Sequence, residues 1–263
     1  MNFSIFFFLI ISFIVFSSTT ACDRCVHKSK VSYFPSSSSL SAGACGYGSM
    51  AMSFNGGYVA ASNPSLYRHG VGCGACFQIR CKNKMCSTSG VKVILTDMSK
   101  SNTTSFVLAK PAFEALAKPG MASEMKNFSI LDVAYKRIPC AYKRNLSVIV
   151  EESSEKPSNL VIKFLFQGGQ TDIVAVDVAQ VGSSDWRYMT QSYNGPVWNT
   201  NRAPAGPLQM RMVVTGGYDG KWIWADKQVI PIEWKIGSVY DLGVQISDIA
   251  QEGCSPCDTD EWK

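Results

Sequence analysis

Ten cysteines are spread unevenly along the 263-residue chain, and their placement constrains the fold more than any other feature. All ten follow residue 21, and none occurs between Cys140 and Cys254. An even number of cysteines in an exported chain predicts disulfide bonds. The long segment without cysteines must therefore build its hydrophobic core without internal disulfides.

Residues 1–21 predict a secretory signal peptide. The apolar run from Ile5 to Phe16 is too short to span a bilayer comfortably, and small residues follow it up to Ala21. No Lys or Arg precedes the run, so only the amino terminus supplies positive charge there. No later segment is long and apolar enough to cross a membrane, so we expect a secreted protein without a membrane partner.

The segment 72–86, GCGACFQIRCKNKMC, holds four cysteines: Cys73, Cys76, Cys81 and Cys86. A zinc site is one interpretation, because the C-x2-C and C-x4-C spacings approach those of zinc ligands. A redox C-x-x-C would need a βαβ setting, which the sequence lacks. Disulfides fit an exported chain best.

Two further C-x-x-C pairs lie near the ends of the mature chain, at Cys22 and Cys25 and at Cys254 and Cys257. We expect these pairs to join each other and hold the termini together. Closing so long a loop would stabilise the fold by roughly 4–5 kcal/mol in the entropic model. A zinc ion held by the four thiolates is the alternative.

The distribution of charge favours two domains. Residues 22–145 carry 16 Lys and Arg against 5 acidic residues, whereas 146–248 carry 8 against 11 and 249–263 carry 1 against 4. A basic first domain suits an acidic polysaccharide, a membrane surface or a nucleic acid, and export makes nucleic acid the weakest of these. A solvated lysine-rich surface is the simpler alternative.

The first half consists mainly of short β runs separated by glycines, with one predicted helix at 110–120. The second half alternates apolar and other residues with the period of a strand, at Val174, Val176 and Val178 and again from Leu208 to Val214. The turn sequence GGYDG (216–220) then leads into Trp222 and Trp224, as in a hairpin. These strands predict an antiparallel sandwich.

Few residues offer catalytic or metal-binding chemistry. His27 and His69 are the only histidines, and two isolated histidines support neither a catalytic triad nor a metal cluster. Three sequons predict glycosylation of exposed loops, at Asn102, Asn127 and Asn145.

Aromatic side chains are the better candidates for a binding surface. An exposed row of flat rings on a sheet could stack on sugar rings, although each single ring is more often part of a core. Trp222 and Trp224 point to the same face of their strand, so both are buried or both are exposed. The candidates are Trp186, Tyr188, Tyr193, Trp198, Trp222, Trp224 and Trp234.

Together, GACGYGSM (43–50), GVGCGACFQIRC (70–81), LTDM (95–98) and AFEALAKPG (112–120) resemble the expansins, plant proteins that loosen cell walls. The C-x-x-C start and the tail GCSPCD resemble the expansin-like A branch. The resemblance implies a six-stranded double-psi β-barrel at 22–145, similar to family 45 glycoside hydrolases. It also implies an immunoglobulin-like, cellulose-binding β-sandwich at 146–248, before an acidic tail at 249–263.

The resemblance further implies that wall polymers are loosened without hydrolysis and without a cofactor. It implies three disulfides, Cys45–Cys73, Cys76–Cys140 and Cys81–Cys86. Where expansins carry a polar and aromatic motif near the start, this chain has Ser32, Tyr33 and Phe34. The aromatic platform of the second domain falls on Phe166 and Tyr193.

The family's two aspartates are not both present in this chain. One survives as Asp97, and the other falls on Val107. Because glycoside hydrolysis needs two carboxyl groups and valine cannot transfer a proton, we expect no glycosidase activity. A relic hydrolase that pairs Asp97 with Asp132 is the weakest alternative.

Two hypotheses about function remain. In the first, a secreted, monomeric wall protein binds cellulose or xyloglucan along one groove formed by Tyr33, Phe34, Phe166 and Tyr193, and loosens the wall by separating polymers. In the second, the protein is a binding module without loosening activity, and its basic first domain grips acidic pectin.

Overall fold

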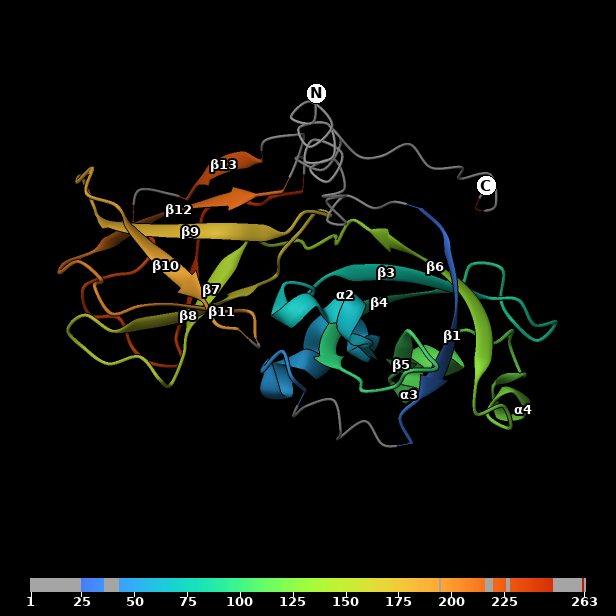
Figure 1. Ribbon diagram of the computed structural model, residues 1–263. Helices are drawn as coiled ribbons and strands as arrows, with labels where there is room; N and C mark the ends of the chain where they lie inside the picture. The colour runs from blue at the N-terminus through green and yellow to red at the C-terminus, as the bar shows by residue number, and fades with distance from the viewer. Residues whose placement is uncertain are drawn as a thin grey trace, which may run out of the picture.

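The computed structural model describes residues 25–35, 43–193, 195–215, 220–225, 228–247 and 262. These residues form a closed β-barrel beside an eight-stranded β-sheet (Figure 1). The predicted signal peptide, Cys22, Cys254, Cys257 and the tail apart from Trp262 lie outside the described residues. Within the described part, no helix has the length and hydrophobicity that a membrane span requires.

The barrel closes in the strand order β1-β5-β2-β4-β3-β6, which confirms the predicted six-stranded barrel. The pairs β1–β5 and β2–β4 are parallel, and the other four are antiparallel. The interior is filled by large apolar side chains such as Phe106, Leu108, Leu95 and Ile79. The strands are β1 (His27–Tyr33), β2 (Val59–Ser62), β3 (Cys76–Cys81), β4 (Val91–Met98), β5 (Phe106–Leu108) and β6 (Leu131–Ile138).

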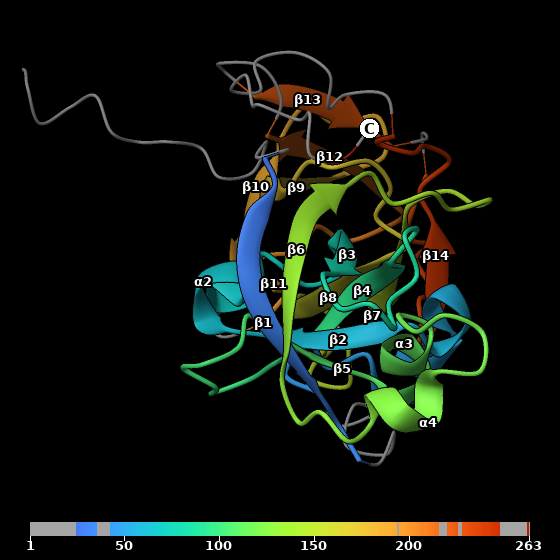
Figure 2. The ribbon, with the colours of Figure 1, turned by 90° about the vertical axis from the view of Figure 1, so that its right-hand side faces the viewer.

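Short helices cover the barrel (Figure 2): η3 (Gly48–Gly57), α2 (Pro64–Tyr67), η4 (Arg68–Gly70), α3 (Lys110–Glu114) and α4 (Ala122–Met125). The helix predicted at 110–120 begins as expected but ends at Glu114. The backbone that follows is held by tertiary hydrogen bonds instead. Ser87 N donates to Leu116 O at 2.8 Å, and Lys118 N donates to Met85 O at 2.7 Å.

The second half forms one sheet in the order β13-β12-β9-β10-β11-β8-β7-β14. All seven pairings are antiparallel, as predicted, but the sheet is continuous and curls around its own core instead of separating into two sheets (Figure 1). Its strands are β7 (Ser147–Val150), β8 (Leu160–Leu165), β9 (Ile173–Gln180), β10 (Arg187–Gln191), β11 (Val197–Thr200), β12 (Leu208–Val214), β13 (Lys221–Trp224) and β14 (Val239–Asp241).

The predicted alternation holds in β12 and fails at one end of β9. Leu208, Met210, Met212 and Val214 are all buried, as expected. In β9, Val176 and Val178 are buried but Val174 is exposed, so that part of the prediction was wrong. The β9–β12 register shifts between Val213 and Val214, and such a bulge turns the side chain of Val174 outward.

Three disulfides brace the barrel: Cys45–Cys73, Cys76–Cys140 and Cys81–Cys86. These are the pairs that the resemblance implies, and they exclude a zinc site within segment 72–86. Cys25 is also disulfide-bonded. Cys22, Cys254 and Cys257 lie outside the described residues, so the predicted pairing of the termini stays a prediction.

A buried ion cluster joins the barrel to the sheet. Asp172, just before β9, accepts hydrogen bonds from Arg68 at 2.6 and 3.1 Å and from Arg137 at 2.6 Å. Only 1% of the Asp172 side chain is exposed. Burial raises the pKa of Asp172, but the charges and hydrogen bonds of the two arginines outweigh burial and hold the pKa below its ordinary value.

Candidate functional site

One row of residues crosses four barrel strands and contains both positions that the expansin resemblance singles out. The strand register pairs Ser32 with Val107, Val107 with Ala61, and Ala61 with Asp97. Residues paired in this way point to the same face of a sheet. Two strand spacings of roughly 4.8 Å separate Val107 from Asp97, so their backbones lie about 10 Å apart across the sheet. The row thus offers one carboxylate, that of Asp97, and Val107 contributes none.

Asp97 is bound to the backbone around it. Its Oδ1 accepts hydrogen bonds from Ala44 N at 2.6 Å and from Met98 N at 2.7 Å. Gly43 packs so closely that a Cβ there would lie 2.8 Å from the Asp97 Cβ. Within the described residues Oδ2 has no hydrogen-bond partner, so one carboxylate oxygen is left to accept a hydrogen bond from a ligand.

A buried tyrosine, Tyr67, lies beside this carboxylate, and two further tyrosines have raised pKa values. Burial, and next to it the charge of Asp97, raises the pKa of Tyr67, whose hydroxyl donates to Ala44 O at 3.2 Å. Burial also raises the pKa of Tyr47, and raises that of Tyr142 to about 12. All three hydroxyls therefore stay protonated near neutral pH, which makes them hydrogen-bond donors and not bases.

The residues predicted near the start of the barrel separate onto two faces. Ser32 belongs to the row with Val107, whereas Tyr33 points to the other face of β1. Tyr33 stacks on Phe113 at 4.4 Å between ring centroids, and its hydroxyl donates to Lys126 O at 3.3 Å. Phe34, just beyond the strand, is half-buried against the barrel core. Tyr33 is thus occupied by packing.

Phe166 and Tyr193 lie at the boundary between the sheet and the barrel. Phe166 is half-buried, with Phe54 and Tyr142 edge-on to its ring, each at 5.7 Å between centroids. Tyr193 is 75% exposed and lies against His69 of η4 at 4.7 Å. Tyr193 therefore offers a free aromatic face next to the barrel, whereas Phe166 offers a smaller part of its ring.

The strand register along β3 argues against the pairing of Asp97 with Asp132. The backbone N–H of Leu95, two residues before Asp97, donates to the carbonyl of Ala75, just before β3. The carbonyl of Asp132 accepts from the backbone N–H of Lys82, just after β3. Seven residues separate these two contacts, which corresponds to roughly 23 Å of strand. Inverting glycosidases need carboxyl groups about 6.5–9.5 Å apart.

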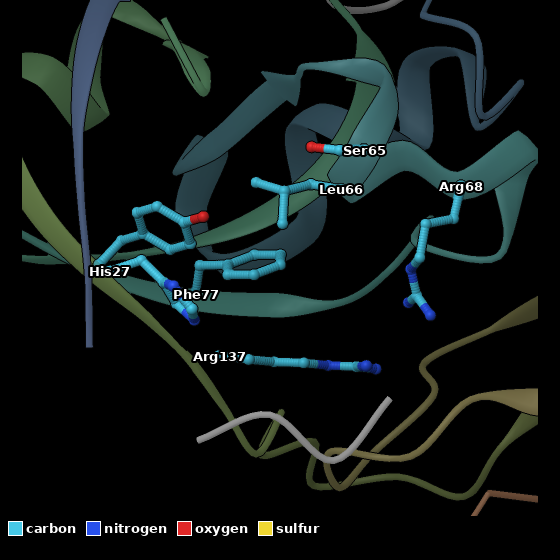
Figure 3. A pocket seen from close by; sticks show the side chains of 7 residues that line it. His27, Ser65, Leu66, Arg68, Phe77 and Arg137 are labelled. Atoms are coloured by element: carbon cyan, nitrogen blue, oxygen red, sulfur yellow. The ribbon is translucent and has the colours of Figure 1, made fainter. Parts of the chain in front are cut away.

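A cavity of about 230 Å³ opens where the barrel meets the sheet (Figure 3). Arg68 and Arg137 extend into it from opposite sides, but both bind Asp172. His27 stacks on Tyr135 at 5.3 Å. The cavity is lined by His27, Ser65, Leu66, Arg68, Phe77, Tyr135 and Arg137. Because its cationic groups already bind a carboxylate, it is part of the domain interface and not an anion site.

The remaining aromatic candidates divide between core and surface. Trp198 and Trp234 are buried, whereas Tyr188, Trp222 and Trp224 are exposed. Trp222 and Trp224 are thus exposed together, as their shared strand face predicted.

No group of three or more His, Cys, Asp or Glu that could hold a metal occurs among the described residues. Of the three sequons, Asn102 and Asn127 are exposed and Asn145 is half-buried. Sequence reasoning missed Tyr67 and the cluster around Asp172, because no motif or spacing distinguishes these residues from others of their kind.

Family models match both halves of the chain. A model described as Expansin C-terminal domain matches residues 146–231, and one described as Lytic transglycolase matches residues 59–135. A bacterial structure, Clavibacter michiganensis expansin, superposes with a TM-score of 0.63 at 16% identity, covering 84% of this chain and 97% of its own. A point mutant of that protein, solved in complex with cellohexaose, superposes equally well.

Relatives in plants are much more similar in sequence. Expansin-like A1 of Arabidopsis thaliana is 55% identical and covers 98% of this chain and 99% of its own length. Expansin-like A3 of Oryza sativa subsp. japonica is 58% identical over 93% of this chain and 91% of its own. The chain therefore belongs to the expansin family and, within it, to the expansin-like A branch.

Proposed function

We propose that this protein is a secreted cell-wall protein that binds cellulose or a related β-glucan without cleaving it, and that loosens contacts between polymers. The observation that carries the proposal is the row from Ser32 to Asp97, which holds one carboxylate and has Val107 at the position where the resemblance implies the second. Sugar hydroxyls can be bound there by Asp97 Oδ2, but no second group can transfer a proton.

Two further observations and one physical argument support this function. Tyr193 presents an exposed ring beside the barrel, suited to stacking on the apolar face of a pyranose. The Clavibacter expansin, which shares the fold, was solved with cellohexaose. Binding that favours a strained or twisted glucan over a packed one would shift the population toward separated chains.

A pull-down with insoluble cellulose tests the binding site. Tyr193→Ala should weaken depletion from solution about tenfold in Kd, equivalent to about 1.4 kcal/mol. Phe128→Ala is the matched control, because Phe128 is also an exposed ring, 43% accessible, but lies away from the sheet. Equal depletion of wild type and Tyr193→Ala would remove Tyr193 from the site.

A wall-extension assay with purified protein tests loosening. Under constant load, isolated wall strips should creep when the protein is added, and Tyr193→Ala should creep less. Binding without creep would leave the protein as a binding module only.

The alternative, a module that binds acidic pectin, is favoured by one surface on the barrel. A cavity of about 330 Å³ is lined by three lysines and one acid: Lys28, Lys30, Lys82 and Asp132. Exposed ion pairs are screened by salt, so pectin held there should be released as ionic strength rises. Cellulose held by stacking should stay bound under the same conditions.

Several expectations about the chain belong to the same proposal. Disulfides in the barrel suit an oxidising compartment, which supports secretion through the predicted signal peptide. We infer glycosylation at the exposed Asn102 and Asn127. We also infer that the protein acts as a monomer, which size-exclusion chromatography with light scattering would test.

A further inference from the structure

The outward face of strands β13, β12, β9 and β10 carries exposed aromatic rings on β10 and β13, with an ion pair on the two strands between them. The register pairs Tyr188 with Asp177, Asp177 with Arg211, and Arg211 with Trp224. Trp222 points to the same face of β13 as Trp224. Tyr188 is 78% exposed, Trp222 50% and Trp224 55%. We call these residues the indole surface after its three tryptophans, Trp186, Trp222 and Trp224; Tyr188 completes it.

Arg211 lies at the centre of this surface and holds the rings in place. Its guanidinium carbon is 4.3 Å from the ring centroid of Trp186, 4.5 Å from that of Trp222 and 5.3 Å from that of Trp224. Trp186 and Trp224 also meet edge to face at 5.2 Å. Such cation–π and edge contacts fix the orientation of the rings, so a ligand would meet a preorganised surface.

The charges on this face are largely neutralised in pairs. Asp177 accepts from Arg211 at 2.8 Å, and Asp185 accepts from Arg187 at 2.6 Å. Arg202, which lines the adjoining cavity, forms no ion pair within the described residues. The face therefore lacks the concentrated positive charge that would select an acidic polymer, and apolar stacking dominates its chemistry.

A polar cavity of about 430 Å³ continues the surface across β10 and β11. Trp186 and Tyr188 belong both to this cavity and to the indole surface. The side-chain amide of Asn199 donates to Thr190 O at 3.1 Å, which fixes the direction in which its carbonyl oxygen points. The cavity is lined by Trp186, Arg187, Tyr188, Thr190, Asn199, Thr200, Asn201 and Arg202.

Aromatic rings beside amides, hydroxyls and a guanidinium match the two sides of a sugar. The apolar C–H face of a pyranose stacks on an aromatic ring, and its rim of hydroxyl groups forms hydrogen bonds with polar side chains. An indole stabilises a fold when it is buried, because apolar area is then removed from water. Indoles that served only to stabilise the sheet would therefore be buried. Here Trp222 and Trp224 are held in place by Arg211 and still face solvent.

We propose that the indole surface and its adjoining cavity form a second binding site, for a neutral β-linked glucan chain, on a face separate from Asp97 and Tyr193. The proposal rests on the proposed function only for the class of ligand. With two sites, one molecule can hold two glucan chains at once.

Titration with cellohexaose, followed by tryptophan fluorescence, tests the site directly. Three of the six tryptophans belong to the indole surface, so occupancy should change the emission. Trp224→Ala should weaken this response about tenfold in Kd. Trp222→Phe keeps a ring and should stay within about threefold of wild type, which separates loss of stacking from misfolding. Ile232→Ala, which alters an exposed apolar residue of a loop, is the control.

Comparison with Tyr193→Ala separates this site from the proposed function. We expect Tyr193→Ala to keep the fluorescence response and Trp224→Ala to lose most of it, while each variant binds insoluble cellulose more weakly than wild type through the site it retains. Wild type should also aggregate cellulose nanocrystals, and Trp224→Ala should not.

The proposal is overturned if cellohexaose leaves the emission unchanged, or if only polygalacturonate changes it and salt abolishes the change. Loss of binding in Trp224→Ala with none in Tyr193→Ala would overturn the role of Tyr193 and leave this proposal standing.

Discussion

Replacing Asp172 with asparagine should uncouple the barrel from the eight-stranded sheet. The carboxylate is 1% exposed and neutralises two arginines of the barrel. Asparagine keeps the shape but not the charge, so Arg137, whose side chain is 7% exposed, loses the Asp172 carboxylate as its buried counterion. Removing one partner from a buried ion pair costs about 3–5 kcal/mol.

We expect a value near the lower end, about 3 kcal/mol, because Arg68 is 26% exposed and water can hydrate part of its charge. For a chain of this size that loss lowers the Tm by roughly 6–12 °C. Urea denaturation followed by circular dichroism would measure it. Asp185→Asn is the matched control, since the Arg187–Asp185 pair is exposed and its loss should cost less than about 1 kcal/mol.

The same cluster predicts how stability depends on pH. The pKa of Asp172 is lowered in the folded state, so its contribution is present above the ordinary aspartate pKa of about 3.9 and is lost as the pH falls through the folded pKa. Wild type should therefore lose stability below about pH 4 more steeply than Asp172→Asn. Equal free energies of unfolding for the two proteins at pH 7 would refute the reasoning.

Three further perturbations test other parts of the structure. Gly70→Ala should destabilise the domain contact, because φ is +97° there and a Cβ would lie 2.3 Å from the backbone of Gly195; thermal unfolding and limited proteolysis would detect the loss. Asp97→Ala should cost about 1–3 kcal/mol by leaving two backbone N–H groups unpaired, whereas Asp97→Asn, which keeps the acceptor oxygen, should cost less in the same urea titration. Replacing both Cys76 and Cys140 with serine should cost about 4 kcal/mol, since that disulfide closes a 64-residue separation; an unchanged midpoint would contradict this.

Local patterns predicted the strands of the fold well, because burial follows a simple period. In β12, alternate residues face the core and the sequence alternates with them. The pattern failed where tertiary hydrogen bonds replaced local ones. Residues 115–118 could continue a helix by propensity, but their backbone forms hydrogen bonds with the backbone of residues 85–87 instead.

The candidate site was predictable only where a motif marks it. Asp97 and Val107 stand out by resemblance, and the register places them in one row. The ion cluster around Asp172 could not be predicted, since its members come from three distant segments and no local pattern links them. The same holds for Arg211, whose contacts with three indoles depend on which strands are neighbours.

The central claim is that this protein binds glucan without hydrolysing it, and one measurement tests it most directly. The purified protein is incubated with cellulose and with xyloglucan, and new reducing ends are counted while its depletion from solution is followed. We expect the protein to bind and the number of reducing ends to stay at the level of the buffer control. Release of reducing sugar that Asp97→Ala abolishes would contradict the claim.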